Sequence, residues 1–251
     1  MKIFDAYAEY YNLLYADKNY EEEVNYVDSL IKLYSKNNFI KRVLDIGCGT
    51  GKHDYLLEKK SYITTGIDAS EKMIKEAKKR ENENLKFYVM DGRNFNLGIK
   101  FDVIVSLFHV VSYQNTNKDI LEYFKNVFNH LDNNGIFIFD FWYGPAVLAD
   151  KPVVRVKRLE NENIQLTRIA EPIIFENKNL VEVNYEILIH KKYDNSLLKL
   201  NEKHTMRYFF IPELEIMLNS NGLKIIDNFE WMNLNEPNFN NWNVVIIAQK
   251  I

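Results

Sequence analysis

Residues 43–51, VLDIGCGTG, place an apolar run directly before three glycines at alternate positions. With the helical pattern that follows over 52–60, this order predicts a strand, a tight turn and a helix. The glycines allow the backbone to turn sharply and to approach a ligand closely. The spacing differs from the dinucleotide fingerprint G-x-G-x-x-G, whose third glycine would fall on Lys52, and no Lys-Ser/Thr pair follows as in a P-loop. Asp45, before the first glycine, would repel a pyrophosphate and would suit a cationic ligand.

The first 140 or so residues continue this alternation of strand and helix patterns. Helical spacing of apolar residues is found over 21–34 and 117–131, and Ser70 is placed to cap a further helix. Short apolar or β-branched runs that predict strands occupy 62–67, 85–89, 101–107 and 136–141. Strands that alternate with helices predict a parallel sheet covered on both faces.

The pattern changes near residue 150. Residues 181–189 alternate apolar and polar side chains, and 153–158, 164–175 and 198–210 also resemble strands. Consecutive strands without helices imply an antiparallel sheet. A helix is expected from Pro212, with Asn221-Gly222 as its C-cap, and strands over 223–229 and 242–249 resume the α/β pattern. We therefore expect a core of residues 1–149 and 211–251, with residues 150–210 inserted over the ligand crevice as a lid or substrate platform.

Composition excludes several classes of protein. The net charge is −3, which gives no basic surface for nucleic acid. A single cysteine excludes an internal disulfide. No apolar stretch approaches the roughly 18–20 residues that span a bilayer, and the N-terminus lacks a signal-peptide pattern. The expectation is a cytoplasmic protein that binds neither nucleic acid nor membrane.

Two further acids follow predicted strands. Asp68 ends YITTGID and Asp91 ends KFYVMD. An acid at the first position accepts hydrogen bonds from a ribose diol. An acid at the second can accept from the exocyclic amine of adenine, with apolar Met73 near the ring. Three acids at the ends of three successive strands, after a glycine loop, predict an adenosine-containing ligand with a cationic group.

This set of motifs resembles the class I S-adenosylmethionine (SAM) dependent methyltransferases. The resemblance rests on VLDIGCGTG at 43–51, GIDAS at 66–70, VMDGRNF at 89–95 and FDVIVSLF at 101–108. It implies an α/β fold: a doubly wound, Rossmann-like sheet of seven strands, the last antiparallel, here with an inserted antiparallel β region. The cofactor-binding residues that it implies are Tyr20, Asp45, Gly47, Gly49, Asp68, Ala69, Met73, Asp91, Gly92, Arg93, Ser106 and Leu107. Within that set, Asp45, Gly47 and Gly49 would contact the methionine part, and Ser106 and Leu107 would lie near the sulfonium.

A narrower resemblance, to the TDP-amino-sugar N,N-dimethyltransferases, spans nearly the whole chain. It rests on AEYYNLLYADKNY at 8–20, His53 after the glycines, SLFHVVSY at 106–113, DFWYGP at 140–145, and an Arg, Arg207, in the last inserted strand. The sequence departs from that family at His109-Val110, where a serine pair is expected, and at Trp142-Tyr143, where two tryptophans are expected. Both departures fall on positions expected to face the substrate.

The acceptor side of the site is predicted from position and chemistry. Methyl transfer from a sulfonium mainly requires alignment and exclusion of water, so one hydrogen-bond acceptor for the nucleophile is enough. Tyr113 and His109 follow the fourth strand, where the methyl group should emerge, and are the candidate catalytic residues. The candidate substrate contacts are Tyr11, Trp142, Tyr143 and Arg207. Core packing remains open for Trp142 and Tyr143, and Arg207 would either hold a phosphate or be a solvated surface cation.

The predicted function is SAM-dependent methylation of a small molecule, foremost the amino group of a nucleotide-linked amino sugar. The alternative is O- or C-methylation of a nucleotide sugar or another small metabolite. A non-catalytic SAM-binding protein is a weaker alternative, since none of the glycines and acids is missing. No metal is expected, and the chain would be a monomer or a homodimer.

Overall fold

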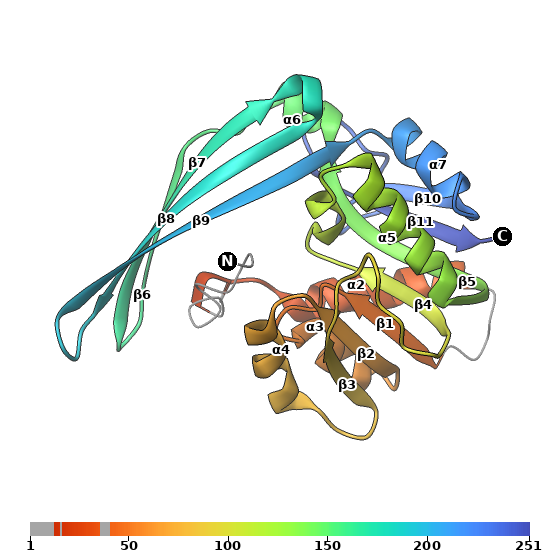
Figure 1. Cartoon of the computed structure of the whole chain (residues 1–251), viewed down its shortest axis with the longest axis horizontal. Coiled ribbons are helices and arrows are strands. Elements are labelled where there is room, and N and C mark those ends of the chain that lie inside the picture. Colours follow the sequence, from red (N-terminus) through yellow and green to blue (C-terminus); the bar gives the residue numbers. More distant parts are fainter. Residues whose placement is uncertain (1–12, 16, 36–40) are drawn as a thin grey trace.

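The computed structural model of the chain describes residues 13–15, 17–35 and 41–251. Its core is a sheet in the order β3-β2-β1-β4-β5-β11-β10 (Figure 1). The core strands are β1 (Arg42–Ile46), β2 (Ile63–Asp68), β3 (Leu85–Val89), β4 (Phe101–Ser106), β5 (Leu131–Tyr143), β10 (Leu223–Glu230) and β11 (Asn243–Lys250). Only β11 runs antiparallel to its core neighbours, β5 and β10. The expected seven-stranded methyltransferase sheet is thereby confirmed within the described residues.

Helices cover both faces of this sheet. They are α2 (Tyr20–Tyr34), α3 (Lys52–Lys59), α4 (Glu71–Ala77), α5 (Asn117–His130), α6 (Gly144–Ala149) and α7 (Ile211–Asn219), with short 3-10 turns η1 (Lys78–Arg80), η2 (Val110–Tyr113) and η3 (Glu176–Lys178). Apolar residues of α2 and α3 pack on one face, and those of α5 and α7 pack on the other. The helical spacing of Val24, Val27 and Ile31 buries one face of α2, as the sequence predicts.

The inserted region forms an antiparallel sheet of β6 (Arg155–Glu160), β7 (Ile164–Phe175), β8 (Leu180–Lys191) and β9 (Ser196–Phe209). Figure 1 shows these strands as a long arm that extends away from the core. The arm is continuous with the core because the end of β9 pairs in parallel with β5, at Trp142↔Tyr208 and Tyr143↔Phe209.

The apolar face of the arm packs back toward the core. The alternation in β8 buries Ile187 and Ile189, which join Leu166 in a cluster with Leu14 and Met73. Lys157 of β6 donates a hydrogen bond of 2.9 Å to the carbonyl of Leu14. The arm thus contacts the N-terminal segment and α4, and each of these elements supplies a residue, Lys18 and Met73, to the cavity that the glycine loop also lines.

Two local features differ from the sequence prediction. The sequence leaves 132–135 as a connection between the predicted helix over 117–131 and the predicted strand over 136–141, whereas α5 ends at His130 and β5 begins at Leu131. The pairing of β4 with β5 is irregular there, and Asn134 adopts a φ of 61°, which asparagine tolerates better than most residues. The helix α6 was not predicted, because six residues are too few for a periodic signal. Within the described residues, no helix is long and apolar enough to cross a membrane.

Candidate active site

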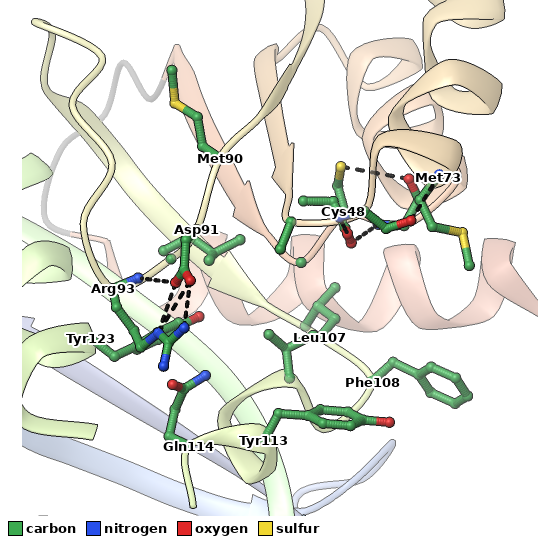
Figure 2. Close-up of a pocket in the computed structure, with 18 of the residues that line it drawn as sticks. Cys48, Met73, Met90, Asp91, Arg93, Leu107, Phe108, Tyr113, Gln114 and Tyr123 are labelled. Carbon is green, nitrogen blue, oxygen red and sulfur yellow. Dashed lines mark hydrogen bonds and ion pairs between the residues drawn. The ribbon is translucent and has the colours of Figure 1, made fainter. Parts of the chain in front are cut away.

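A cavity of about 420 Å³ opens at the carboxyl ends of β1 to β4. Its walls come from the glycine loop after β1, the end of β2, the segment after β3, and the residues after β4 (Figure 2). In open α/β sheets this edge is where ligands bind. The predicted cofactor residues that line the cavity are Gly47, Gly49, Asp68, Ala69, Met73, Asp91, Gly92, Arg93 and Leu107.

The glycine loop is held in a conformation that a side chain would disturb. The backbone N–H groups of Gly47 and Cys48 donate to the carbonyl of Ile67, at 2.8 and 3.0 Å. Gly47 has a φ of +84°, and a Cβ added there would lie 2.4 Å from a methyl carbon of Val110. The loop therefore passes tightly beneath η2, which leads directly to Tyr113.

Asp68 organises the loop from the end of β2. Its Oδ2 accepts from the backbone N–H of Gly49 at 3.0 Å, and its Oδ1 accepts from that of Ser70 at 2.7 Å. Each carboxylate oxygen has a second lone pair, and the side chain lines the cavity. This geometry fits a carboxylate that binds a ribose diol.

Asp91 is paired within the cavity wall. The guanidinium of Arg93 donates to both Asp91 oxygens from Nε, at 2.9 and 3.2 Å, and from Nη2, at 2.6 Å (Figure 2). Arg93 Nη1 also donates to Asp119 at 2.8 Å. Arg93 thus lies in the cavity wall as predicted, and its guanidinium joins Asp91 to Asp119. Gly92 is required between the two because an added Cβ would lie 2.6 Å from the ring of Tyr123.

Three predicted cofactor residues are not among the residues that line the cavity. Asp45 is 1% exposed and lies beneath the loop. Ser106 is fully buried, where it accepts from the Tyr123 hydroxyl at 2.7 Å and donates to the carbonyl of Ile46. Tyr20 packs its ring 4.9 Å from that of His53. In this structure their side chains support the cavity wall from behind.

The buried Asp45 faces a second buried carboxyl group, that of Asp54 on α3. Burial, together with the nearby charge of Asp68, raises the pKa of Asp45 to about 7. Burial and repulsion by Asp45 raise the pKa of Asp54 well above its usual range. The pair therefore retains a proton at neutral pH, because two buried like charges in contact cannot both ionise.

The two candidate catalytic residues lie in different cavities. Tyr113 lines the large cavity beside Leu107 and Phe108 (Figure 2). Burial raises the pKa of its hydroxyl well above the usual value, so Tyr113 stays protonated at neutral pH. His109 instead lines a neighbouring cavity of about 280 Å³, together with Asp140 at the end of β5.

His109 and Asp140 are in close contact in that second cavity. Nδ1 of His109 and Oδ2 of Asp140 are 2.6 Å apart, in a contact that lacks the directionality of a hydrogen bond. The backbone N–H of His109 also donates to the carboxylate, at 3.1 and 3.2 Å. Burial alone would raise the pKa of Asp140, but the contacts with His109 outweigh burial and lower it. Asp140 is therefore ionised at neutral pH.

The predicted substrate contacts do not converge on either cavity. Trp142 packs 5.4 Å from Trp242, and Tyr143 packs against the core cluster between the sheet and α5. Arg207 is 7% exposed, and its guanidinium bonds to Asn117, at 2.8 Å, and to Glu213. These partners join β9 to α5 and α7, an arrangement that favours a structural role for Arg207 over the expected phosphate contact. Tyr11 lies outside the described residues.

Two cavity residues, Lys18 and His53, belong to quoted motifs but were not predicted as site residues. Lys18 lines both cavities, with its ammonium 3.6 Å above the ring centre of Phe108 and 3.0 Å from Glu23. Burial lowers the pKa of Lys18, against the opposing effect of Glu23. His53, noted in the sequence for its position after the glycines, contacts the same Glu23 at 2.7 Å. Their contacts cross between elements distant in the chain, and no local pattern predicts them.

Comparison with known proteins agrees with this geometry. Residues 43–135 match the family described as a methyltransferase domain. The chain therefore contains a methyltransferase domain, and solved structures that share its fold include SAM-dependent and SAM-bound methyltransferases. Among the described residues, no group of three or more His, Cys, Asp or Glu side chains is placed to hold a metal ion.

The similarity extends beyond the matched domain. The chain is 26% identical, over 87% of its length and 90% of the relative's, to dTDP-3-amino-3,4,6-trideoxy-alpha-D-glucopyranose N,N-dimethyltransferase of Streptomyces venezuelae. Its fold resembles that of a SAM-dependent methyltransferase from Clostridium acetobutylicum, with a TM-score of 0.82, 21% identity and 99% of both chains covered. It also resembles SAM-bound CalS10, an amino pentose methyltransferase from Micromonospora echinaspora, with a TM-score of 0.77, 18% identity, and 100% and 99% of the two chains covered.

Replacing Asp68 with alanine should weaken SAM binding by about tenfold or more. A charge-assisted hydrogen bond contributes about 1.5–3 kcal/mol, and the variant also loses the acceptor for the Gly49 N–H. Calorimetric titration with SAM measures the change. The control is Asp150→Asn, which removes an exposed carboxyl group outside the cavity. This variant should bind SAM with the affinity of the parent. Unchanged affinity in Asp68→Ala would mean that the ribose binds elsewhere.

Proposed function

We propose that the chain transfers methyl groups from SAM to the amino group of a nucleotide-linked amino sugar. The observation that carries this proposal is the extent of the match to the Streptomyces venezuelae enzyme. The methyltransferase domain ends at residue 135, but the similarity covers 87% of the chain and therefore includes most of the β6–β9 arm. Similarity outside the cofactor domain carries information about the acceptor, since SAM binding does not require it.

The acceptor side of the large cavity suits an amine. Beyond Leu107 the lining combines apolar Phe108 and Val110 with the polar side chains of Tyr113 and Gln114. A sugar amine is cationic at neutral pH and must lose a proton before it can attack. A protonated tyrosine accepts a hydrogen bond from such an amine without bearing a charge itself, so Tyr113 can orient and desolvate the nucleophile. Bound SAM supplies the electrophilic methyl group on a positively charged sulfur.

The second cavity offers a negative field next to the first. Its walls carry Glu22, Glu23 and the ionised Asp140. Among the described lining residues, Lys18 is the one lysine or arginine beside them. A field of this sign favours a cationic acceptor over a neutral hydroxyl. His109, held by Asp140, is the second candidate for orienting the nucleophile.

The same proposal assigns roles to the two parts of the chain. Residues 1–149 and 211–251 form the SAM-binding core, and residues 150–210 cover the substrate cleft. This assignment is supported by the packing of the arm on Leu14 and Met73, since Met73 also lines the large cavity.

The test is incubation of the enzyme with SAM and a panel of TDP-linked 3-amino, 4-amino and hydroxy sugars. Products are read by mass spectrometry as gains of one or two methyl increments, and fragmentation identifies the methylated atom. We expect methylation of amino sugars and none of the matched hydroxy sugars. Methyl transfer only to oxygen or carbon would replace this proposal with the O- or C-methyltransferase alternative.

A further inference from the structure

Three side chains form a continuous polar chain behind the wall of the large cavity. The Tyr113 hydroxyl lies 2.8 Å from Nδ1 of His204, and Nε2 of His204 lies 3.0 Å from Oε2 of Glu202. Glu202 and His204 alternate along β9, so their side chains share one face of the arm. The chain of contacts therefore runs from the cavity into the inserted sheet.

This chain is shielded from water. The side chains of His204 and Glu202 are 3% and 5% exposed. The ring of Tyr185, on β8, packs edge-on against His204 with centres 4.9 Å apart. The titratable and charged groups that face this cluster from the elements packed on it are Tyr15, Asp68, Tyr113, Arg168, Tyr185 and Glu202. A buried carboxylate and imidazole with mutual hydrogen bonds is an arrangement that fixes the imidazole tautomer.

The hydrogen-bond donors follow from the chemistry of each group. An ionised carboxylate only accepts, so Nε2 of His204 carries a proton and donates to Glu202. A neutral imidazole then has a bare Nδ1, which accepts from the Tyr113 hydroxyl. The Tyr113 proton is therefore directed toward His204, and the Tyr113 hydroxyl, which lines the cavity, accepts a hydrogen bond from the ligand. The raised pKa of Tyr113 agrees with a hydroxyl that keeps its proton.

We infer that His204 and Glu202 are positioning residues that draw a proton from the acceptor amine through Tyr113. This inference rests on the proposed function. An N–H bond of the acceptor ammonium breaks and its proton moves to the Tyr113 oxygen, while the hydroxyl proton moves to Nδ1 of His204. The nitrogen keeps the electron pair that attacks the methyl group, and the imidazolium is stabilised by Glu202. The reverse shift returns the proton to water after the product leaves.

The relay also accounts for how a site could methylate the same nitrogen twice. Each transfer leaves a protonated, methylated amine, which must lose a proton before a second transfer. A proton acceptor such as His204, which is regenerated between turnovers and does not itself contact the nitrogen, meets this need. Tyr113, which would contact the acceptor, remains the candidate catalytic residue.

A first experiment tests the hydrogen-bond chain without any acceptor. NMR of the full-length enzyme labelled with ¹⁵N-histidine reports the tautomer and titration of each of the five histidines, and loss of a signal in His204→Asn assigns His204. We expect the Nε2–H tautomer. In Glu202→Gln the preference for this tautomer should weaken, because an amide oxygen is a poorer acceptor for the His204 Nε2–H than a carboxylate. An Nδ1–H tautomer in the parent, or an unchanged tautomer ratio in Glu202→Gln, would overturn the inference.

A second experiment tests the coupling to catalysis. His204→Asn and Tyr113→Phe should each lower kcat by about tenfold to a hundredfold, with little change in SAM affinity. The double variant should lose no more than the larger single loss, because both residues act in one relay. In Glu202→Gln the acidic limb of the pH profile of kcat should move to lower pH. If that limb instead reflected ionisation of the free substrate amine, the substitution would leave it in place.

The matched control is His190→Asn on β8 of the same sheet, outside both cavities. It should leave kcat and the pH profile unchanged. Additive losses in the double variant, or full activity of His204→Asn, would overturn the relay while leaving amino-sugar methylation intact. If the parent enzyme methylates only hydroxyl acceptors, the proposed function fails, and the relay is decided by the tautomer and by the same double-variant coupling with the hydroxyl acceptor.

Discussion

Replacing Gly47 with alanine should reduce SAM affinity by at least about a hundredfold. Gly47 has a φ of +84°, which costs an L-residue roughly 1–2 kcal/mol. The added Cβ would also lie 2.4 and 2.6 Å from the two methyl carbons of Val110. Val110 begins η2, so relief of the clash displaces the turn that carries Tyr113. Strain and clash together exceed the roughly 2.7 kcal/mol that a hundredfold loss represents.

The measurement is calorimetric titration of Gly47→Ala with SAM, together with its thermal unfolding. The matched control is Gly98→Ala. Gly98 has a similar φ of +68°, it lies outside the cavity, and a Cβ there would meet no atom of the described residues within 4 Å. We expect the control to lose a little stability and to keep its SAM affinity. Normal SAM affinity in a folded Gly47→Ala would show that the loop tolerates another conformation.

The core of the fold could be predicted from sequence because its signals are local. The helix α5 follows from apolar residues repeated at helical spacing, such as Ile120, Phe124 and Val127. The strand β8 follows from strict alternation, and its buried face is the predicted one. The glycine loop and the strand-end acids are also local motifs, and parallel topology brings Asp68 and Asp91 to one edge of the sheet.

The partners of polar side chains could not be predicted, because they come from distant parts of the chain. Tyr113 meets His204 across 91 residues, and Arg207 meets Asn117 across 90. His109 meets Asp140, which is notable in the sequence only as the first residue of DFWYGP. Strand pairing at the β5–β9 junction decides the first two contacts, and no single-strand pattern encodes which core strand an inserted sheet will join. The contact between His109 and Asp140 follows from the pairing of β4 with β5.

The position of a residue after a strand likewise does not indicate which way its side chain points. Tyr113 and His109 follow the same strand, yet they line different cavities. Phe108 and His109 both adopt positive φ values, of 66° and 63°. This left-handed turn, which is uncommon for residues with side chains, separates the directions of the two side chains. The sequence therefore predicts the neighbourhood of the acceptor site but not which cavity each residue serves.

The buried carboxyl pair beneath the glycine loop makes stability depend on pH. Burial raises the pKa values of Asp45 and Asp54 in the folded chain, with a further increase for Asp45 from the charge of Asp68 and for Asp54 from that of Asp45. The folded state therefore holds a proton that the unfolded chain has released above about pH 4. The stability contributed by that proton is fully present below the unfolded pKa and is lost as pH rises through the folded pKa. We expect the free energy of unfolding to fall as pH rises from 5 to 8.

Replacing Asp54 with asparagine should remove much of this loss. The amide can donate a hydrogen bond to the Asp45 carboxylate without taking up a proton, and its size is nearly unchanged. At pH 8 the free energy of unfolding should rise by about 1–3 kcal/mol relative to the parent, within the limit of about 1.4 kcal/mol per proton and pH unit. At pH 5 the two proteins should differ little. Urea titrations at both pH values measure the difference, with exposed Asp150→Asn as the control, which should follow the parent at both. If the free energy of unfolding of Asp54→Asn fell between pH 5 and pH 8 by as much as that of the parent, Asp54 would not hold the proton.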